Sequence, residues 1–314
     1  MNTITKGRWV NLHRLAVIFV ATIVLQTGNG PSASQTRRRS QNNPQASHPR
    51  ETMSPEAREL VEKAIEVVCL ERQKDPKGSI PIDDMQGRPS LPVQSPEAVA
   101  GAERAQRLLP VAKTLVISSI RQLAGRYGFA SGQPRRLSQA IARVQSVRRI
   151  RPDMESRDNA SVLLRAPHTI TFGTIFLVGL PSDEAMISVL AHELMHIADG
   201  EQDSLQGLFR AVGRRASSLT ALQVRGQRAE ELTCDLIGVM ASRAYVATMP
   251  SYEQLSRRIA RSVAHNCVEE DEGDEDHLSP RNTIRALFAL DPVLTRELVY
   301  NRDERGRRTS VPNR

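Results

Sequence analysis

Three side chains in the middle of the chain have the types and the spacing of a hydrolytic metal site. They lie in the stretch VLAHELMHIADG (189–200), where His192 and His196 flank Glu193 in the order His-Glu-x-x-His. With 7 histidines and 21 glutamates in 314 residues, chance predicts about 0.01 occurrences of this pattern in such a chain. Two imidazoles one helical turn apart can bind one metal ion, and the carboxylate between them can act as a base toward water.

This spacing can do chemistry only if the motif lies on a helix. Ser182 is a suitable N-cap, the two acidic residues after it suit the positive end of a helix dipole, and Gly200 favours termination. Apolar and motif residues recur at steps of three and four between these ends. The sequence therefore predicts a helix of about 18 residues over 182–200, with both histidines on one face.

A catalytic zinc ion needs three protein ligands and one open position. A third histidine six residues after the second is one known arrangement, but that position is Gln202 here. The other arrangement takes a glutamate from a later helix, and RAEELTCDLIGVMASRAY (228–245) is predicted to be that helix. Glu231 is the predicted ligand, with Glu230 as the alternative. Asp235, one turn further on, is expected to hydrogen-bond the outer N–H of a ligand histidine.

The surrounding sequence resembles the HtpX-like and CAAX-prenyl-protease-like gluzincin metallopeptidases, peptidase family forty-eight. The resemblance is strongest over 159–200, where an Asn-Ala pair precedes GTIFLV, a Gly-Leu step and a Val-Leu-Ala-His-Glu helix start. The later Glu-x-x-x-Asp also matches that family. A third block, HLSPRNTIRAL (277–287), is similar to the family's C-terminal His-Pro…Ile-Arg-Ala-Leu segment. It departs from that segment at Leu278, where Pro is usual, and at Thr283, where a basic residue is common.

The resemblance covers about residues 105–290 and implies an α+β, mainly helical, zincin-like metallopeptidase fold with a small sheet next to the active-site helix. It implies that Glu193 is the catalytic base. It also implies a second catalytic residue, His277, which either donates a hydrogen bond to the oxyanion or occupies the open metal position; a surface histidine is the alternative. Arg285 is implied to contact substrate or the oxyanion. The implied ligands of one Zn²⁺ per chain are His192, His196 and Glu231.

The elements around the motif are predicted from periodicity. Helical spacing predicts helices over 54–74 and 96–128, the second bent or interrupted at Pro110. Segments rich in β-branched and aromatic residues predict two strands, 160–166 and 168–178.

Two expectations about the sheet follow from this pattern. The segment 142–151 fits a strand or a helix. The residues 169–178 are expected to pair with an extended substrate along a sheet edge.

The first residues indicate export. Three basic residues precede LAVIFVATIVL (15–25), an apolar run of eleven that is too short to span a bilayer comfortably. Small polar residues follow, as in a secretory signal, and an uncleaved anchor is the alternative. The body is therefore expected in the periplasm or on the outer side of the membrane. The predicted segments are a signal peptide or anchor (1–34), a disordered linker (35–54), a helical segment (55–100), the zinc metallopeptidase domain (101–300) and a basic tail (301–314).

Charge and cysteine content restrict the classes of function. The net charge is +8, but residues 1–50 hold seven basic and no acidic residues, which leaves 36 basic against 35 acidic residues in the body. This balance, with 4% aromatic residues, argues against a nucleic-acid binder. Eleven basic and no acidic residues lie between Glu103 and Asp153, and 269–276 holds seven acids in eight residues. Both are interpreted as solvated surface; the alternative is a basic face toward anionic lipid, with the acidic loop beside the mouth of the active site.

The three cysteines, Cys69, Cys234 and Cys267, allow one disulfide and one thiol, and their pairing stays open. The lack of a Cys-x-x-Cys pair argues against a thiolate zinc site. Together these features predict a zinc-dependent endopeptidase that acts on envelope or misfolded exported proteins. The alternative is a zinc-bearing, chaperone-like binding module with little or no peptidase activity.

Overall fold

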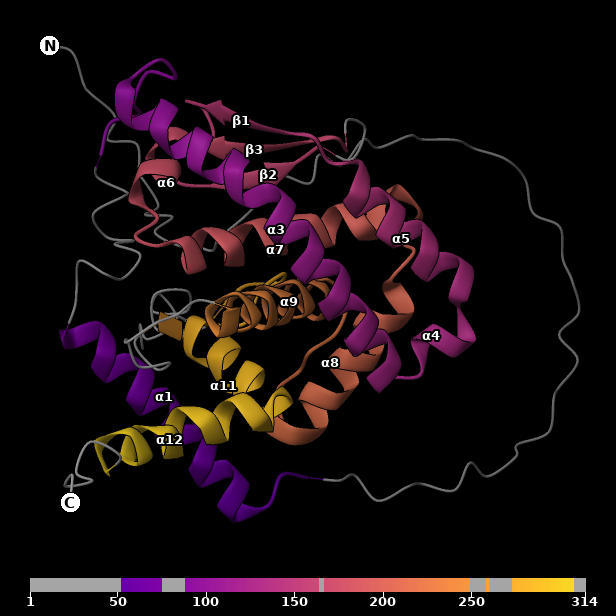
Figure 1. The fold of residues 1–314 in the computed structure, drawn as a ribbon. Coiled ribbons are helices and arrows are strands. Elements are labelled where there is room, and N and C mark those ends of the chain that lie inside the picture. Colours follow the sequence, from indigo (N-terminus) through magenta and orange to yellow (C-terminus); the bar gives the residue numbers. More distant parts are fainter. Residues whose placement is uncertain (1–51, 75–87, 164–166, 249–257, 260–272, 308–314) are drawn as a thin grey trace, which may run out of the picture.

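A computed structural model describes residues 52–74, 88–163, 167–248, 258–259 and 273–307 (Figure 1). The predicted signal peptide or anchor, most of the linker, Cys267 and the first part of the acidic run lie outside these residues. Within the described part of the chain, no helix combines the length and the apolar character needed to cross a membrane.

Helices make up most of the described chain and surround one three-stranded sheet, which confirms the predicted mainly helical α+β class. In Figure 1 the sheet lies above α7, and α9 lies below it, while α1, α11 and α12 gather at the lower left. The elements are α1 (Pro55–Lys74), α3 (Pro96–Arg126), α4 (Phe129–Gly132), α5 (Pro134–Ser146), β1 (Arg149–Asp153), β2 (Ala160–Val162), β3 (Thr169–Gly173), α6 (Thr174–Gly179), α7 (Asp183–Asp199), α8 (Gln206–Thr220), α9 (Gln227–Thr248), α11 (Pro280–Leu290) and α12 (Pro292–Arg307).

The predicted helices agree with the structure to within three residues at each end. Helix α3 runs without a break through Pro110, which lies on its exposed side, so the predicted interruption does not occur. The ambiguous segment 142–151 contains both alternatives, because α5 ends at Ser146 and β1 begins at Arg149.

The strand predicted over 168–178 is wrong beyond Gly173, where the chain turns into α6. The carbonyl of Arg157 accepts hydrogen bonds from the N–H groups of Ile175 and Phe176, at 3.1 and 3.2 Å. A Cβ at position 173 would lie only 1.9 Å from that carbonyl oxygen. Glycine thus permits the close approach that supplies partners to the first turn of α6, and a tertiary contact ends the strand.

The order of the strands is β1-β3-β2, with β3 parallel to β1 and antiparallel to β2. Because both edges of β3 are already paired, the expectation that residues 169–178 bind an extended substrate is wrong. The edge next to the motif helix belongs to β2, which contacts α7. A further strand on this side of the sheet would have to pair with Ala160–Val162.

Helix α1 packs against the last two helices and not against the sheet. The carboxylate of Glu62 accepts a hydrogen bond from Arg285 of α11 at 2.8 Å, and Arg281 lies 3.9 Å from it. The predicted boundaries at residues 100 and 300 fall inside α3 and α12. The helical segment at 55–100 is therefore packed into the same body as the motif.

Helix α7 is the central element, and nearly all of its side chains are buried. The hydroxyl of Ser182 accepts the N–H of Ala185 at 3.2 Å and caps its start, as predicted. At its other end Arg143 of α5 donates to the carbonyls of Ala198 and Asp199, at 3.0 and 2.8 Å. Both ends of the helix are therefore fixed by side chains, which holds the motif in place.

Helices α7 and α9 approach closely at Gly238. A Cβ at this position would lie 2.9 Å from the Ser188 hydroxyl oxygen and 3.0 Å from the Ser188 carbonyl oxygen. Ser188 stands one turn before His192, and Gly238 stands one turn after Asp235. The absence of a side chain at Gly238 thus sets the distance between the two helices that carry the motif residues.

Replacement of Gly238 by Ala should lower the free energy of unfolding by roughly 1–3 kcal/mol, because the added methyl overpacks this contact. Thermal unfolding monitored by circular dichroism would measure the change. Gly125→Ala in α3 is the matched control, since a Cβ there meets nothing within 4 Å, and it should be neutral or slightly stabilising. Equal stability of the two variants would show that the α7–α9 contact tolerates a side chain.

Candidate metal centre

The two motif histidines and Glu231 bring two ring nitrogens and two carboxylate oxygens close together. The Nε2 atoms of His192 and His196 lie 3.1 Å apart. The Oε2 atom of Glu231 is 3.3 Å from the first of these nitrogens, and its Oε1 atom is 3.6 Å from the second. Ligand atoms in a tetrahedral site with bonds of about 2.0–2.1 Å lie ~3.3 Å from one another. Two overlapping groups of side chains here could hold a metal ion: His192, His196 and Cys234, and His196, Glu230 and Glu231.

The outer nitrogen of each imidazole is bonded to its own carboxylate. His192 Nδ1 donates to Asp235 at 2.9 Å, and His196 Nδ1 donates to Glu230 at 3.1 Å. These bonds leave both Nε2 atoms on the side of Glu231, where each would offer its lone pair to a metal ion once it has lost its proton. Asp235 lies where the sequence predicted it. Glu230, the alternative ligand, lies instead on the outer side of His196, a place that the sequence did not predict.

The electrostatics of the cluster favour positive charge. Burial lowers the pKa of His192, but the contacts with the carboxylates of Asp235 and Glu231 outweigh this and raise it to about 9. Burial also raises the pKa of Glu231, yet the contacts with both imidazoles hold it well below its usual range. Glu231 is therefore ionised, as a ligand must be.

Two buried carboxylate oxygens have no hydrogen-bond partner among the described residues. These atoms are Oε1 of Glu193 and Oε2 of Glu231. The other oxygen of Glu231 accepts a hydrogen bond from Gln227 at 3.1 Å. Leaving such atoms without partners in the interior is costly, and a metal ion and its water would satisfy both. The residues present therefore fit a bound metal ion.

Glu193 is the candidate base. Its side chain lies on α7 between the two histidines in sequence and is 1% exposed. Burial raises its pKa, because the charged form loses water on entering the interior. A carboxylate in this environment takes up a proton more readily than an exposed one, which suits a group that must accept a proton and release it again.

His277 reaches the cluster from a loop that precedes α11. Its Nε2 atom lies 3.9 Å from Oε2 of Glu231, and its Nδ1 atom bonds Asp274 at 3.0 Å. Gly273, with φ of 77°, closes this loop, and Arg228 of α9 donates to the Asp274 carbonyl at 2.9 Å. The loop thus brings His277 to the site, as the resemblance implies. Asp274 belongs to the acidic run, and it positions a histidine instead of serving only as solvated surface.

Arg285 is used elsewhere. Its Nε donates to Glu62 of α1 at 2.8 Å, and its Nη1 donates to Asn282 at 2.7 Å. Its guanidinium therefore ties α11 to α1. These contacts give Arg285 a packing role, and its implied contact with substrate or the oxyanion stays a prediction.

The two described cysteines differ in state. Cys69 is disulfide-bonded, whereas Cys234 is free and buried. The sulfur of Cys234 lies 3.8 Å from His196 Nδ1, and Cys234 with the two histidines is one of the two groups that could hold a metal ion. Burial raises the pKa of the Cys234 thiol far above its usual range. Since a thiolate is the ligand form, Glu231 is the better candidate.

No protein-family model matches the chain, and comparisons with curated proteins and with solved structures also find no match. The assignment of the site therefore depends on its motif and its geometry. A metal ion held on one side of a buried carboxylate is an arrangement that can activate water.

Replacement of Glu231 by Ala should abolish stable metal binding, because it removes a ligand. Glu230→Ala and Asp235→Ala should each weaken the metal affinity by roughly 10–100-fold, because each frees an imidazole ring to rotate. Exposed Glu201, just beyond α7, provides the control variant Glu201→Ala. Metal content after dialysis and competition with a chromophoric chelator would measure these effects. If Glu230→Ala removed all metal and Glu231→Ala kept it, Glu230 would be the ligand.

Proposed function

We propose that this protein is a zinc-dependent endopeptidase with a zincin-like fold of the gluzincin type. The observation that carries the proposal is the set of three side chains, His192, His196 and Glu231, with closest donor-atom distances of 3.1–3.6 Å, beside the buried carboxylate of Glu193. Two imidazoles and one carboxylate form the ligand set of zinc peptidases, which leaves a fourth position for water or substrate. The borderline-soft nitrogen donors favour zinc over magnesium or calcium.

The chain's own residues supply the proton transfers. When bound, zinc lowers the pKa of a water molecule toward neutrality and polarises the scissile carbonyl. Oε1 of Glu193, which lacks a hydrogen-bond partner among the described residues, would accept the proton of the attacking water and pass it to the leaving amine. Glu230 and Asp235 would hold the two imidazole rings in their orientation during this step.

The proposed substrates are extended segments of envelope or misfolded exported proteins. The edge of β2, next to α7, is the position at which such a segment would add a strand to the sheet. Main-chain hydrogen bonds would then hold the substrate with little regard to its side chains. The disulfide bond of Cys69 and the basic-apolar N-terminus support an oxidising location outside the cytoplasm.

The variant Glu193→Gln should bind zinc and fold like the wild type but lose peptidase activity by at least about 100-fold, because an amide cannot accept the proton. Cleavage of fluorescently labelled casein and metal content, measured on the same sample, separate the two properties. Glu201→Gln is the control and should keep full activity. Turnover by Glu193→Gln at the wild-type rate would remove Glu193 from the mechanism.

The alternative, a chaperone-like binding module, has the same site residues, and activity distinguishes the two. A wild-type chain that binds zinc and unfolded casein without cleaving it would favour the binding module. Aggregation assays on a heat-denatured client protein would then measure that function directly.

His277 has two possible roles, and these predict opposite outcomes for His277→Ala. If its imidazole donates a hydrogen bond to the oxyanion, the substitution should lower the turnover rate by roughly 10²–10³-fold. If its Nε2 atom occupies the open metal position until substrate displaces it, the substitution should raise basal activity. Steady-state kinetics on unfolded casein distinguish them. Unchanged kinetics would assign His277 to the packing of the 273–278 loop alone.

A further inference from the structure

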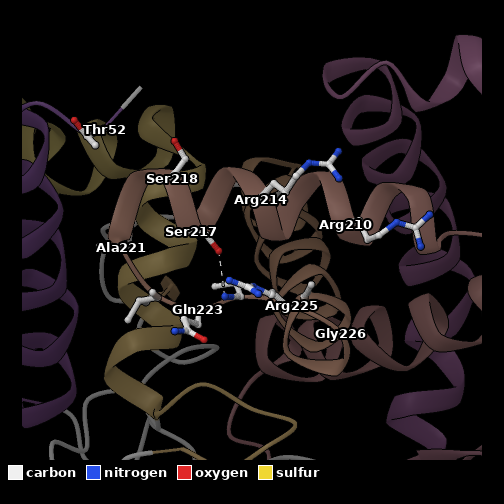
Figure 2. Close-up of a pocket in the computed structure, with 12 residues that line it drawn as sticks. Thr52, Arg210, Arg214, Ser217, Ser218, Ala221, Gln223, Arg225 and Gly226 are labelled. Atoms are coloured by element: carbon white, nitrogen blue, oxygen red, sulfur yellow. Dashed lines mark hydrogen bonds between the residues drawn. The ribbon is translucent and has the colours of Figure 1, made fainter. Parts of the chain in front are cut away.

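A pocket of about 770 Å³ opens between α8, the loop that follows it and the start of α9 (Figure 2). None of the residues of the metal centre lines it. Its floor is held by a hydrogen bond from the N–H of Val224 to the Ser217 hydroxyl, 3.1 Å long, which ties the loop to α8. Apolar side chains such as Leu222 form part of the wall. The pocket is thus distinct from the metal centre, and the hydrogen bond between its loop and α8 stabilises it.

Three arginines line this pocket. Figure 2 shows Arg214 above α8, Arg210 nearer the right-hand end of this helix, and Arg225 in the loop after the helix. None of the three has an ion pair or a side-chain hydrogen bond with the described residues, and none of the described lining residues is acidic. Elsewhere in the same structure Arg104, Arg258 and Arg285 each pair with a carboxylate. Three guanidinium groups without partners in one concavity indicate a ligand with several negative charges.

The volume of the pocket and the spacing of its arginines favour an extended acidic peptide as the ligand. The pocket has the volume of sites that enclose drug-sized ligands and far exceeds a single phosphate. Arg210 and Arg214 stand one helical turn apart, ~6 Å along the axis. Side chains at alternate positions of an extended chain lie ~6.7 Å apart on one face. Two carboxylates at such positions could therefore each meet one arginine, and the apolar wall could contact the intervening residues.

A nucleic-acid strand fits less well. Base stacking on aromatic side chains is a main source of affinity for single strands. No described residue that lines the pocket is aromatic. The arginines could recognise only the backbone phosphates of such a strand. The rest of the pocket would then have no matching contact.

The pocket is connected to the metal centre through α8. Gln206, at the first position of that helix, donates to Glu230 at 3.5 Å, and Glu230 in turn bonds His196. Arg210 and Arg214 follow Gln206 at steps of four, which places them along one row on the helix surface. The row leads from the metal centre to the pocket over roughly 12 Å, by the rise per residue of a helix. An extended polypeptide can span that distance with about four residues.

We propose that this pocket binds an acidic segment of a polypeptide and so holds substrates whose scissile bond lies at the metal centre. Binding of an acidic segment does not depend on the proposed function. That the bound segment belongs to a substrate rests on it. The interaction is electrostatic and weakens as the salt concentration rises. It selects chains with acidic residues at alternate positions.

Fluorescence anisotropy of the full chain would test the proposal, with the labelled peptide Gly-Glu-Ser-Glu-Ser-Glu-Gly and a matched peptide with Gln in place of Glu. The triple variant Arg210→Gln, Arg214→Gln, Arg225→Gln should weaken binding of the acidic peptide about tenfold or more. The control removes three exposed arginines elsewhere: Arg121→Gln, Arg135→Gln and Arg136→Gln. It should leave the affinity within about twofold, and the Gln peptide should bind weakly to every variant.

Equal loss of affinity in both triple variants would overturn the proposal, because net charge alone would then explain binding. It would also be overturned if inorganic pyrophosphate or phosphatidylglycerol vesicles bound through the three arginines and the acidic peptide did not. Should the triple variant unfold by circular dichroism, Arg214→Gln and Arg214→Lys would be compared. Both should weaken binding, since lysine keeps the charge but lacks the bidentate fork.

A kinetic measurement separates this proposal from the peptidase function. For a cleavable substrate with an acidic stretch, the pocket variant should raise KM about tenfold with kcat unchanged, whereas a substrate without acids should be cleaved as by the wild type. If the chain cleaves nothing, the anisotropy result still decides whether the pocket binds acidic peptides.

Discussion

The close crossing of α7 and α9 is the contact on which the whole centre depends. Five titratable side chains meet there, two imidazoles and three carboxylates, largely removed from water. Charges in such a place are tolerated only when each has a partner at hydrogen-bonding distance. An outward shift of either helix would break several of these pairs at once, so small residues at the crossing, Gly238 and Ser188, matter as much as the polar ones.

The sequence could specify the parts of the centre that depend on one helix. His192 and His196 share a face because the period of a helix requires it, and the Glu231–Asp235 spacing follows the same rule. The rotation of one helix about its own axis, relative to a neighbouring helix, is not determined by the local sequence. Glu230 and Glu231 are adjacent, and only the packing of α9 against α7 decides which carboxylate turns inward and which supports His196 from outside.

The errors elsewhere have a similar cause. The end of β3 at Gly173 is set by the carbonyl of Arg157, a residue on another segment, and no pattern around position 173 reveals it. Arg285 was matched to a family segment, but its partner Glu62 lies 223 residues earlier in the chain. The described acidic residues of 269–276 are exposed, as their composition predicts, but composition does not reveal that one of them, Asp274, bonds His277. Net charge is equally uninformative, because it does not distinguish arginines with partners from those without.

The packing of α1 against α11 and α12 joins the first and last described helices of the chain. Contacts of such large sequence separation close late in folding, because a long loop must be ordered before they form. His192, His196 and Glu231 lie on α7 and α9, whereas His277 lies later in the chain, in the loop that precedes α11. During synthesis the candidate metal ligands would thus emerge before that loop. If this chain has the proposed peptidase function, it would finish its reactive centre late in synthesis, when little of the chain is left unfolded.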